Sequence, residues 1–286
     1  MGPFLGLQAR AVCGHCLKVQ TQKEIQVMSA SKPYARLAEV WDQMGQDEHS
    51  KRMVEYVLDI FDKAKFSPES GLDLCCGTGT AIKMLTEQGI DMAGVDGSAE
   101  MLNAAHRKLR GTGADLYHQI LPKLKVQRRK PPRKMRTFDF VVSFYDSLNY
   151  LETARKLGET FKAVNKHLNP KGYFIFDMNT AKALSTIWDS QIHAEVRDDL
   201  VWVFRNQYNA KRGSATVKAT FFVNKGKRWE RFDEDHTEYA YSNTHIRTLL
   251  RQAGFKVEGI YRCYTMRKAS RDTERICVVA RKSSKK

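Results

Sequence analysis

The sequence predicts an α/β fold, in which a doubly wound parallel sheet carries helices on both faces and a small antiparallel β insert is added. Three observations predict it. Short apolar segments alternate with amphipathic ones across residues 72–179, as expected for parallel strands joined by crossover helices. A glycine-rich turn, "CCGTGT", ends the first apolar segment. Residues 193–241 then alternate polar and apolar side chains, which is the period of strands with one buried face.

The elements of this fold follow one another in a regular order. Apolar residues at three- and four-residue spacing predict helices over residues 34–66, 80–89, 98–110, 153–168 and 243–254. Short apolar segments predict strands over residues 72–76, 91–96, 114–120, 138–145 and 173–179, and a closing hairpin over 256–266 and 275–282. Ser98 is the predicted N-cap of its helix. Pro170 and Gly172 are expected to turn the chain, and Gly213 and Gly226 to separate three or four strands of the insert.

The chain is predicted to divide into one core, an insert and a leader. Residues 28–192 and 242–286 form the core, and residues 193–241 form the insert. Residues 1–27 contain one acid and no clear periodicity, so we interpret them as a disordered or non-native leader. The leader contains "CGHC" at residues 13–16, which has the spacing of half a metal or redox site. A zinc site needs a second ligand pair, which is not apparent, so we predict no metal.

The formal net charge of +16 is concentrated in two segments. Residues 123–136 contain eight Lys or Arg and no acid, and residues 281–286 add four more. Such segments bind phosphate backbones by releasing counterions, but they also occur as solvated loops and tails. Nucleic acid therefore stays open as a partner through these two segments.

Cysteine usage indicates a reducing compartment. Cys75 and Cys76 are adjacent and Cys277 lies in an apolar strand, so the six cysteines do not suggest a disulfide framework. We therefore predict a cytoplasmic protein, in which Cys75 and Cys76 act mainly as packing residues. No apolar run in the sequence approaches the roughly 18–20 residues of a membrane span, so no membrane is expected as a partner.

The glycine turn predicts a nucleotide site at the carboxyl edge of the sheet. Glycine lacks the Cβ that would keep a ligand away from the backbone. A dinucleotide fingerprint would place a third glycine where Ile82 stands, and no phosphate-binding GKS or GKT follows. Asp96 ends the next strand, 17 residues beyond Gly79, where a carboxylate can accept both hydroxyls of a ribose. These features argue against a dinucleotide and against phosphoryl transfer.

Four motifs in order, "LDLCCGTG", "MAGVDGSAEML", "FDFVVSFYDSLNYL" and "LNPKGYFIFDMNT", resemble those of class I S-adenosylmethionine-dependent methyltransferases. The resemblance covers roughly residues 34–180 and 243–282. It implies a Rossmann-like seven-stranded sheet, S-adenosyl-L-methionine as cofactor and methyl transfer as activity. The chain looks most like the small-molecule type (methyltransferase domains 25 and 11), which is similar to sugar and amine N-methyltransferases with a β-sheet insert. The implied acceptor is a nitrogen or oxygen of a small molecule.

The resemblance implies roles for the motif residues. Asp73, Gly77 and Gly79 would line the methionine and ribose parts of the cofactor. Asp96 would hold the ribose hydroxyls, and Met101 would pack near the adenine. The full set of expected cofactor-binding residues is Tyr34, Asp73, Cys75, Gly77, Thr78, Gly79, Asp96, Gly97, Met101, Gln119 and Phe144.

The resemblance also implies which residues lie near the transferred methyl group. Tyr34 matches an aromatic residue that covers the cofactor, and the backbone of Phe144 would lie beside the sulfonium. Asp146, Ser147 and Asn149 would face the substrate. The insert and the leading helix would form a lid over the site.

A general base is needed only if the acceptor carries a proton to be lost. The candidate catalytic residues are Asp146 and His236, the second of which lies where the insert returns to the core. Water is a further alternative. Whether the protein acts as a monomer or a homodimer stays open.

Two other functions stay open, one because of the basic segments and the other because of a departure from the family's pattern. Relatives often carry an acid after the third strand to bind the adenine amine, whereas this chain has Gln119 followed by Ile120. The amide oxygen of Gln119 can still accept a hydrogen bond. One alternative is an RNA methyltransferase that docks through residues 123–136, and the other is a cofactor-binding protein without transfer activity.

Overall fold

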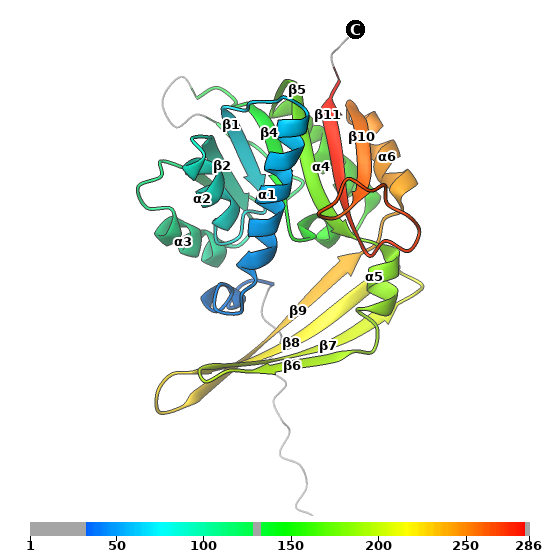
Figure 1. Cartoon of the computed structure of the whole chain (residues 1–286). Helices are drawn as coiled ribbons and strands as arrows, with labels where there is room; N and C mark the ends of the chain where they lie inside the picture. The colour runs from blue at the N-terminus through cyan, green and yellow to red at the C-terminus, as the bar shows by residue number, and fades with distance from the viewer. Residues whose placement is uncertain (1–32, 128–132, 284–286) are drawn as a thin grey trace, which may run out of the picture.

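The computed structural model describes residues 33–127 and 133–283. Its larger part is a seven-stranded sheet with helices on both faces, and a separate four-stranded sheet lies below it in the view of Figure 1. The predicted α/β fold with an antiparallel addition is therefore confirmed. The leader with its "CGHC" segment, the centre of the first basic segment and the end of the tail lie outside the described residues.

The seven-stranded sheet has the strand order β10-β11-β5-β4-β1-β2-β3. Strands β1 to β5 run parallel, while β11 runs antiparallel to both of its neighbours. The order reverses between β1 and β4, which is where a doubly wound sheet opens a ligand site at its carboxyl edge. The strands are β1 (Ser70–Leu74), β2 (Asp91–Asp96), β3 (Asp115–His118), β4 (Phe138–Ser143), β5 (Leu168–Asn179), β10 (Phe255–Arg262) and β11 (Arg275–Lys282).

Amphipathic helices cover both faces of this sheet. Three of them, α1 to α3, pack their apolar stripes against one face, around Phe140 and Ile175. The helices α4 and α6 cover the opposite face, around Phe174 and Phe176. The side chain of Ser98 accepts the N–H that begins α3, so the predicted N-cap is confirmed. The helices are α1 (Asp47–Lys63), α2 (Thr80–Glu87), α3 (Ala99–Lys108), α4 (Ala154–Lys166) and α6 (Asn243–Gln252).

The second sheet is antiparallel, in the order β6-β7-β8-β9. Its inner face carries Trp202 and Phe221, which pack against Leu37 and Val40. We call residues 34–46 the N-terminal segment. This segment thus lies against the second sheet. A hydrogen bond from Ser98 Oγ to the Tyr34 carbonyl also joins it to the N-terminus of α3, which covers the seven-stranded sheet. The elements here are α5 (Ala181–Thr186), β6 (Ile192–Val196), β7 (Leu200–Asn209), β8 (Ser214–Asn224) and β9 (Trp229–Tyr239).

The helix predicted over residues 34–66 is wrong in its first third. Only the 3-10 turn η1 (Leu37–Glu39) forms there, and α1 begins at Asp47. The apolar residues that gave the helical spacing, Val40 and Met44, are buried against the second sheet instead. Gly45, with φ of +74°, separates the two stretches. Tertiary packing has therefore overridden the local helical period.

The last parallel strand is longer than predicted. It begins at Leu168, before the expected turn at Pro170 and Gly172, because Leu168 pairs with Phe138. A register shift follows in β4, between Phe138 and Phe140. Across the described ranges, no helix is both long and apolar enough to cross a membrane.

Candidate active site

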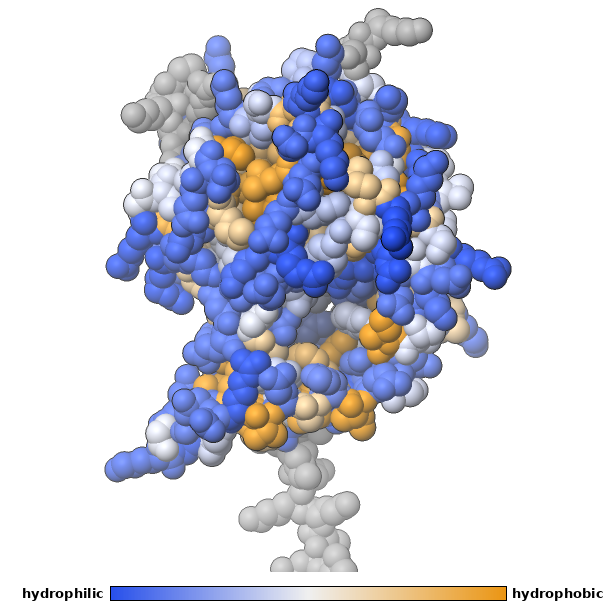
Figure 2. Space-filling model, viewed as in Figure 1, coloured by the Kyte–Doolittle hydropathy of each residue, from blue (hydrophilic) through white to orange (hydrophobic). Residues whose placement is uncertain are grey.

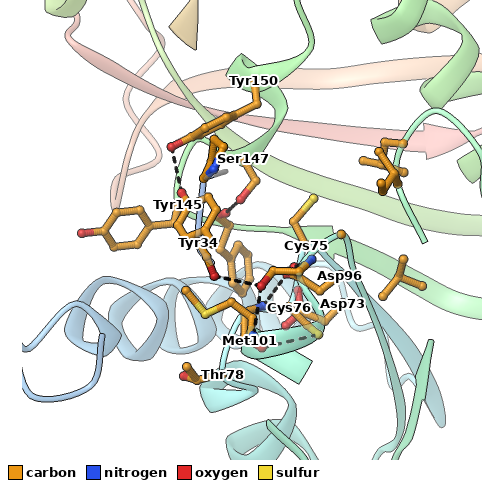
Figure 3. Close-up of a pocket in the computed structure, with 18 of the residues that line it drawn as sticks. Tyr34, Asp73, Cys75, Cys76, Thr78, Asp96, Met101, Tyr145, Ser147 and Tyr150 are labelled. Atoms are coloured by element: carbon orange, nitrogen blue, oxygen red, sulfur yellow. Dashed lines mark hydrogen bonds between the residues drawn. The ribbon is translucent and has the colours of Figure 1, made fainter. Parts of the chain in front are cut away.

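A first cavity, of about 430 Å³, opens at the carboxyl ends of β1, β2 and β4. It lies where the strand order reverses. The glycine turn after β1 forms one wall, and Tyr34 and Trp41 of the N-terminal segment form another. Figure 3 shows side chains from these elements around one space, with the hydroxyls of Tyr34 and Tyr150 joined by a hydrogen bond.

The two glycines of the turn have different structural roles. Both have left-handed backbones, with φ of +53° at Gly77 and +82° at Gly79. A Cβ on Gly77 would meet nothing within 4 Å, so its backbone stays open to the cavity that it lines. A Cβ on Gly79 would lie 2.9 Å from the side chain of Leu109. Gly79 precedes α2 as its N-cap and serves helix packing, rather than lining the cavity.

Asp96 holds the turn in place from the end of β2. Its carboxylate accepts the N–H groups of Gly77 and Ser98, both at 2.8 Å. Burial raises the pKa of Asp96, although these N–H groups oppose the shift. Burial, followed by the charge of Asp96, raises the pKa of Asp73 well above its ordinary value. Two buried acids beside an open backbone offer strong acceptors for hydroxyl or ammonium groups.

The first cavity brings together ten of the eleven residues that the sequence assigned to a cofactor, all except Gly79. The set that lines it is Tyr34, Asp73, Cys75, Gly77, Thr78, Asp96, Gly97, Met101, Gln119 and Phe144. The amide of Gln119 is already engaged, because its Oε1 accepts the N–H of Lys125 at 2.7 Å and its Nε2 donates to the Lys125 carbonyl at 2.8 Å. Binding of adenine through Gln119 therefore stays a prediction.

The adjacent cysteines fit a packing role. Cys76 is buried and Cys75 partly buried, and both line the first cavity. Burial, and then the charge of Asp96, raises the pKa of both thiols well above the ordinary value. A thiol held in its protonated form is a poor nucleophile.

A second cavity, of about 480 Å³, lies between the N-terminal segment and the inner face of the second sheet. Tyr34, Trp41, Tyr145 and Tyr150 line both cavities. Figure 2 shows a hollow between the upper part of the molecule and the lower sheet. Much of its lining is aromatic or apolar, and its acidic, basic and imidazole side chains are Asp146, His193, His236, Glu238 and Arg275.

A buried ion cluster joins this cavity to β5 and β11. The guanidinium of Arg275 bonds the carboxylates of Asp146 and Asp177. His49 Nε2 lies 3.3 Å from the same oxygen of Asp177. Burial alone would raise the pKa of Asp177, but Arg275 and His49 outweigh it and lower the pKa to about 2. Burial, and then the charge of Asp146, raises the pKa of Glu238 well above its ordinary value.

Both candidate catalytic residues line the second cavity. Asp146 follows Tyr145 in a stretch where both residues have left-handed backbones, with φ of +49° and +61°. Such strain in non-glycine residues concentrates at functional sites. The carboxylate of Asp146 is bound by Arg275 and by the Asn179 amide at 2.8 Å. His236 is buried, and its Nδ1 lies 2.9 Å from the Tyr150 hydroxyl.

Of the two further residues expected to face a substrate, the structure places only one beside a cavity. Ser147 lines the first cavity and donates to the Phe144 carbonyl at 2.8 Å. Asn149 is fully buried. Its amide bonds the backbone of Asn179 and the carbonyl of Tyr239, so it holds β5 and β9 to the turn η2 (Ser147–Tyr150).

Sequence reasoning found His236 but missed Glu238 and Arg275, which line the same cavity. Glu234, which was also missed, His236 and Glu238 occupy alternate positions of β9 and are all buried. The preceding residue of that face is Phe232. The sequence carried a signal for the residues of β9, because polar side chains at the inward positions of an amphipathic strand need a hydrogen-bond or ion partner. Arg275 gave no such signal, since it begins an apolar strand.

The two described ends of the first basic segment lie in different places, since Lys125 near one end bonds Gln119 of the first cavity. Gln127 and Met135 form an antiparallel bridge. Arg136 bonds Asp91 at 2.7 Å and Asp115 at 3.1 Å, and these acids begin β2 and β3. The Arg136 end of the segment is therefore anchored at the amino edge of the sheet, whereas the first cavity lies at the carboxyl edge.

We expect replacement of residues 128–134 by Asn-Gly to leave cofactor affinity and thermal stability unchanged. The bridge between Gln127 and Met135 supplies the two ends that a two-residue hairpin turn can close. Equilibrium dialysis with labelled S-adenosyl-L-methionine and a thermal melt test this. Loss of cofactor binding would show that the basic segment belongs to the site.

A comparison with protein-family models identifies the chain's relatives. A family model described as "Methyltransferase domain" (type 23) matches residues 44–259. The sequence motifs pointed to types 25 and 11 of the same superfamily. The crystal structure of an S-adenosylmethionine-dependent methyltransferase from Clostridium acetobutylicum ATCC 824 superposes with a TM-score of 0.76 and 28% identity, over 88% of this chain and 99% of that one.

Curated proteins give the same result. YqeM of Bacillus subtilis (strain 168), a methyltransferase by assignment, is 31% identical over 218 residues, which are 76% of this chain and 86% of that protein. The dTDP-3-amino-3,4,6-trideoxy-alpha-D-glucopyranose N,N-dimethyltransferase of Streptomyces venezuelae is 26% identical, over 77% of this chain and 90% of that enzyme. The chain therefore belongs to the S-adenosylmethionine-dependent methyltransferase family.

Proposed function

We propose that the protein transfers a methyl group from S-adenosyl-L-methionine in the first cavity to an amine of a small molecule in the second. The observation that carries this proposal is that the two cavities share four aromatic residues, Tyr34, Trp41, Tyr145 and Tyr150. Ligands in the two spaces would meet at this shared wall. In-line displacement needs that geometry, since holding the reactants in line supplies about 7–11 kcal/mol of the barrier.

The residues of the first cavity fit the cofactor. Its volume of about 430 Å³ lies within the roughly 300–1,000 Å³ usual for small-molecule sites. The open backbone at Gly77 would lie against the ligand, and the Asp96 carboxylate would accept ribose hydroxyls. Asp73 would accept the ammonium group of the methionine part. When bound there, the cofactor supplies a methyl group on a positively charged sulfur.

The lining of the second cavity favours an amine over an anionic acceptor. It presents the acid side chains of Asp146 and Glu238 beside the single guanidinium of Arg275, whose charge is already offset by Asp146 and Asp177. Aromatic faces add attraction for a cation. The Streptomyces venezuelae relative is named for dimethylation of an amino sugar, which supports the same class of acceptor here.

In this proposal the protein's main contribution is to orient the acceptor and exclude water. Tyr34 and Trp41 of the N-terminal segment would close the shared wall from one side, and Tyr145 and Tyr150 from the other. The left-handed backbones of Tyr145 and Asp146 set the position of this side of the shared wall.

Three further expectations stay predictions. The free cysteines of the described chain, Cys75, Cys76, Cys263 and Cys277, suit a reducing cytoplasm. A monomer and a homodimer both remain open. Nucleic acid is a partner only if the basic segments bind it. Arg136 is anchored at the amino edge of the sheet, opposite the first cavity, so this end of the segment would dock a nucleic acid without placing it in the site.

The experiment that tests the proposal is transfer of tritium from labelled S-adenosyl-L-methionine. The acceptors are dTDP-3-amino-3,4,6-trideoxy-α-D-glucopyranose, D-glucosamine, and a cell extract separated into RNA, protein and small-molecule fractions. We expect label in an amine of the small-molecule fraction. Label confined to RNA or protein would overturn the proposal, and retention of label in the cofactor under all conditions would favour a binding protein without transfer activity.

A further inference from the structure

A line of four side chains runs from the shared wall of the two cavities into the second sheet. The Tyr34 hydroxyl donates to the Tyr150 oxygen at 2.9 Å. The Tyr150 hydroxyl lies 2.9 Å from His236 Nδ1. On the other side of the ring, His236 Nε2 lies 3.3 Å from an oxygen of Glu234. These residues come from the N-terminal segment, from η2 and from β9.

The direction of the hydrogen bonds along this line follows from the residues at its ends. Glu234 is fully buried and lies 3.3 Å from Nε2, so the tautomer with its proton on Nε2 directs that proton toward an acceptor oxygen. Nδ1 is then an acceptor for the Tyr150 hydroxyl. The contact between Nε2 and Glu234 is not a hydrogen bond, and Nε2 has no hydrogen-bond partner among the described residues. Glu234 is therefore the group that the His236 proton faces.

We propose that Tyr34, Tyr150 and His236 form a proton relay for the acceptor amine, with Glu234 as the positioning residue that orients the imidazole. The inference rests on the proposed function, because it assigns the path by which a bound ammonium becomes a nucleophile. Tyr34, which like Tyr150 lines both cavities, is the end of the relay that meets the amine, and His236 is the end that stores the proton.

The proton and electron balance is simple. The ammonium gives a proton to the Tyr34 oxygen, Tyr34 gives its own to Tyr150, and Tyr150 gives its own to His236 Nδ1. The resulting imidazolium lies beside the Glu234 carboxylate. The lone pair freed on nitrogen then forms the bond to the methyl carbon, while the carbon–sulfur bond breaks and its electron pair stays on sulfur. The product leaves as a methylated ammonium.

The tyrosines pass the proton as neutral phenols. Burial raises the pKa of Tyr34 and of Tyr150 well above the ordinary value, so neither rests as a phenolate. The titratable groups that face His236 are Tyr34 and Tyr150 from the elements packed on it, and Glu234 and Glu238 from its own strand. Asp146, His193 and Arg275 line the same cavity.

Glu234 faces His236 and also holds the N-terminal segment, and the experiment must separate these two roles. Its carboxylate accepts the N–H groups of Tyr34 and Arg36, each at 2.7 Å, and of Leu37 at 2.9 Å. One buried acid thus fastens the N-terminal segment and orients the imidazole. Glu234→Gln can keep one oxygen for the N–H groups of Arg36 and Leu37 while its amide faces Tyr34 N–H and His236, whereas Glu234→Ala removes both functions.

The kinetic test uses Tyr150→Phe, His236→Gln and Glu234→Gln with the best amine found for the wild-type protein. A lost proton-transfer partner costs about 10²–10⁴-fold. We expect kcat to fall by at least about 10²-fold in the first two variants, with KM and cofactor affinity unchanged. The acid limb of the kcat profile, where the relay is already protonated, should disappear in both. Tyr241→Phe and His245→Gln, which change a buried tyrosine and an exposed histidine outside both cavities, are the controls.

A second readout does not need an acceptor. Long-range proton–nitrogen correlation of histidine-labelled protein with S-adenosylhomocysteine, assigned through His236→Gln, reports which ring nitrogen carries the proton. We expect Nε2–H in the wild type and a change of tautomer in Glu234→Gln. Nδ1–H in the wild type, or full kcat and an intact acid limb in Tyr150→Phe, would overturn the relay. If no amine is methylated while the tautomer is as expected, the proposed function fails and the geometry of the relay stands.

Discussion

Asp96→Ala is expected to abolish binding of S-adenosyl-L-methionine while the protein stays folded. The side chain would lose two charge-assisted bonds to ribose hydroxyls, each worth about 1.5–3 kcal/mol. The sum of about 3–6 kcal/mol corresponds to roughly 10²- to 10⁴-fold in affinity. Isothermal titration calorimetry measures the affinity, and a thermal melt shows that the fold is kept.

A variant at the other end of the same strand serves as the control. Asp91 begins β2, and its side chain is 69% exposed beside Arg136. Asp91→Asn should leave cofactor affinity unchanged, because this residue lies at the amino edge. Asp96 also holds the N–H groups of Gly77 and Ser98, so some loss of stability is expected, of about 1–3 kcal/mol for groups left unpaired. Unchanged cofactor binding in Asp96→Ala would contradict the assignment of the first cavity.

The second large effect is expected for Arg275→Met, which should lower the free energy of unfolding by about 3–5 kcal/mol. The variant leaves the buried carboxylates of Asp146 and Asp177 without their cation. Breaking a buried ion pair costs much more than the pair contributes, because the remaining charge stays desolvated. Urea denaturation followed by circular dichroism measures the loss.

The pH dependence of this loss has a definite sign. The folded pKa of Asp177, about 2, lies below the ordinary 3.8. A depressed pKa contributes stability that is fully present above the ordinary value and is lost as the pH falls through the folded value. The difference between wild type and Arg275→Met should therefore shrink between about pH 4 and pH 2.

An exposed arginine provides the matched control. The side chain of Arg271 is 94% exposed and pairs only weakly with Asp272, at 3.8 Å. Arg271→Met should change the free energy of unfolding by no more than about 0.5 kcal/mol. Equal effects of the two variants would mean that the Arg275 cluster is solvated rather than buried.

The sequence predicted the seven-stranded part well because each of its signals is local. The glycine turn, the cap at Ser98 and the strand that ends at Asp96 need only their neighbours to form. The N-terminal segment was predicted wrongly for the opposite reason. Its apolar spacing fits a helix, but Val40 and Met44 are buried by a sheet whose strands lie far away in the chain.

The candidate site also has one part that local signals predict and one part that depends on long-range contacts. The first cavity was predictable, since its residues belong to motifs with fixed spacing. The second depends on contacts across long separations, such as Tyr150 with His236 and Asp146 with Arg275. Neither pair has a periodic signal, so only the folded structure shows that these side chains meet.

The attachment of the N-terminal segment has a consequence for both cavities. Tyr34 and Trp41 line both cavities, and the segment that carries them is fastened to β9 through Glu234 and to the glycine turn through the bond between Thr78 and Asp42. One short stretch of backbone thus belongs to the boundary of both spaces, so a substitution that loosens either fastening changes both cavities at once.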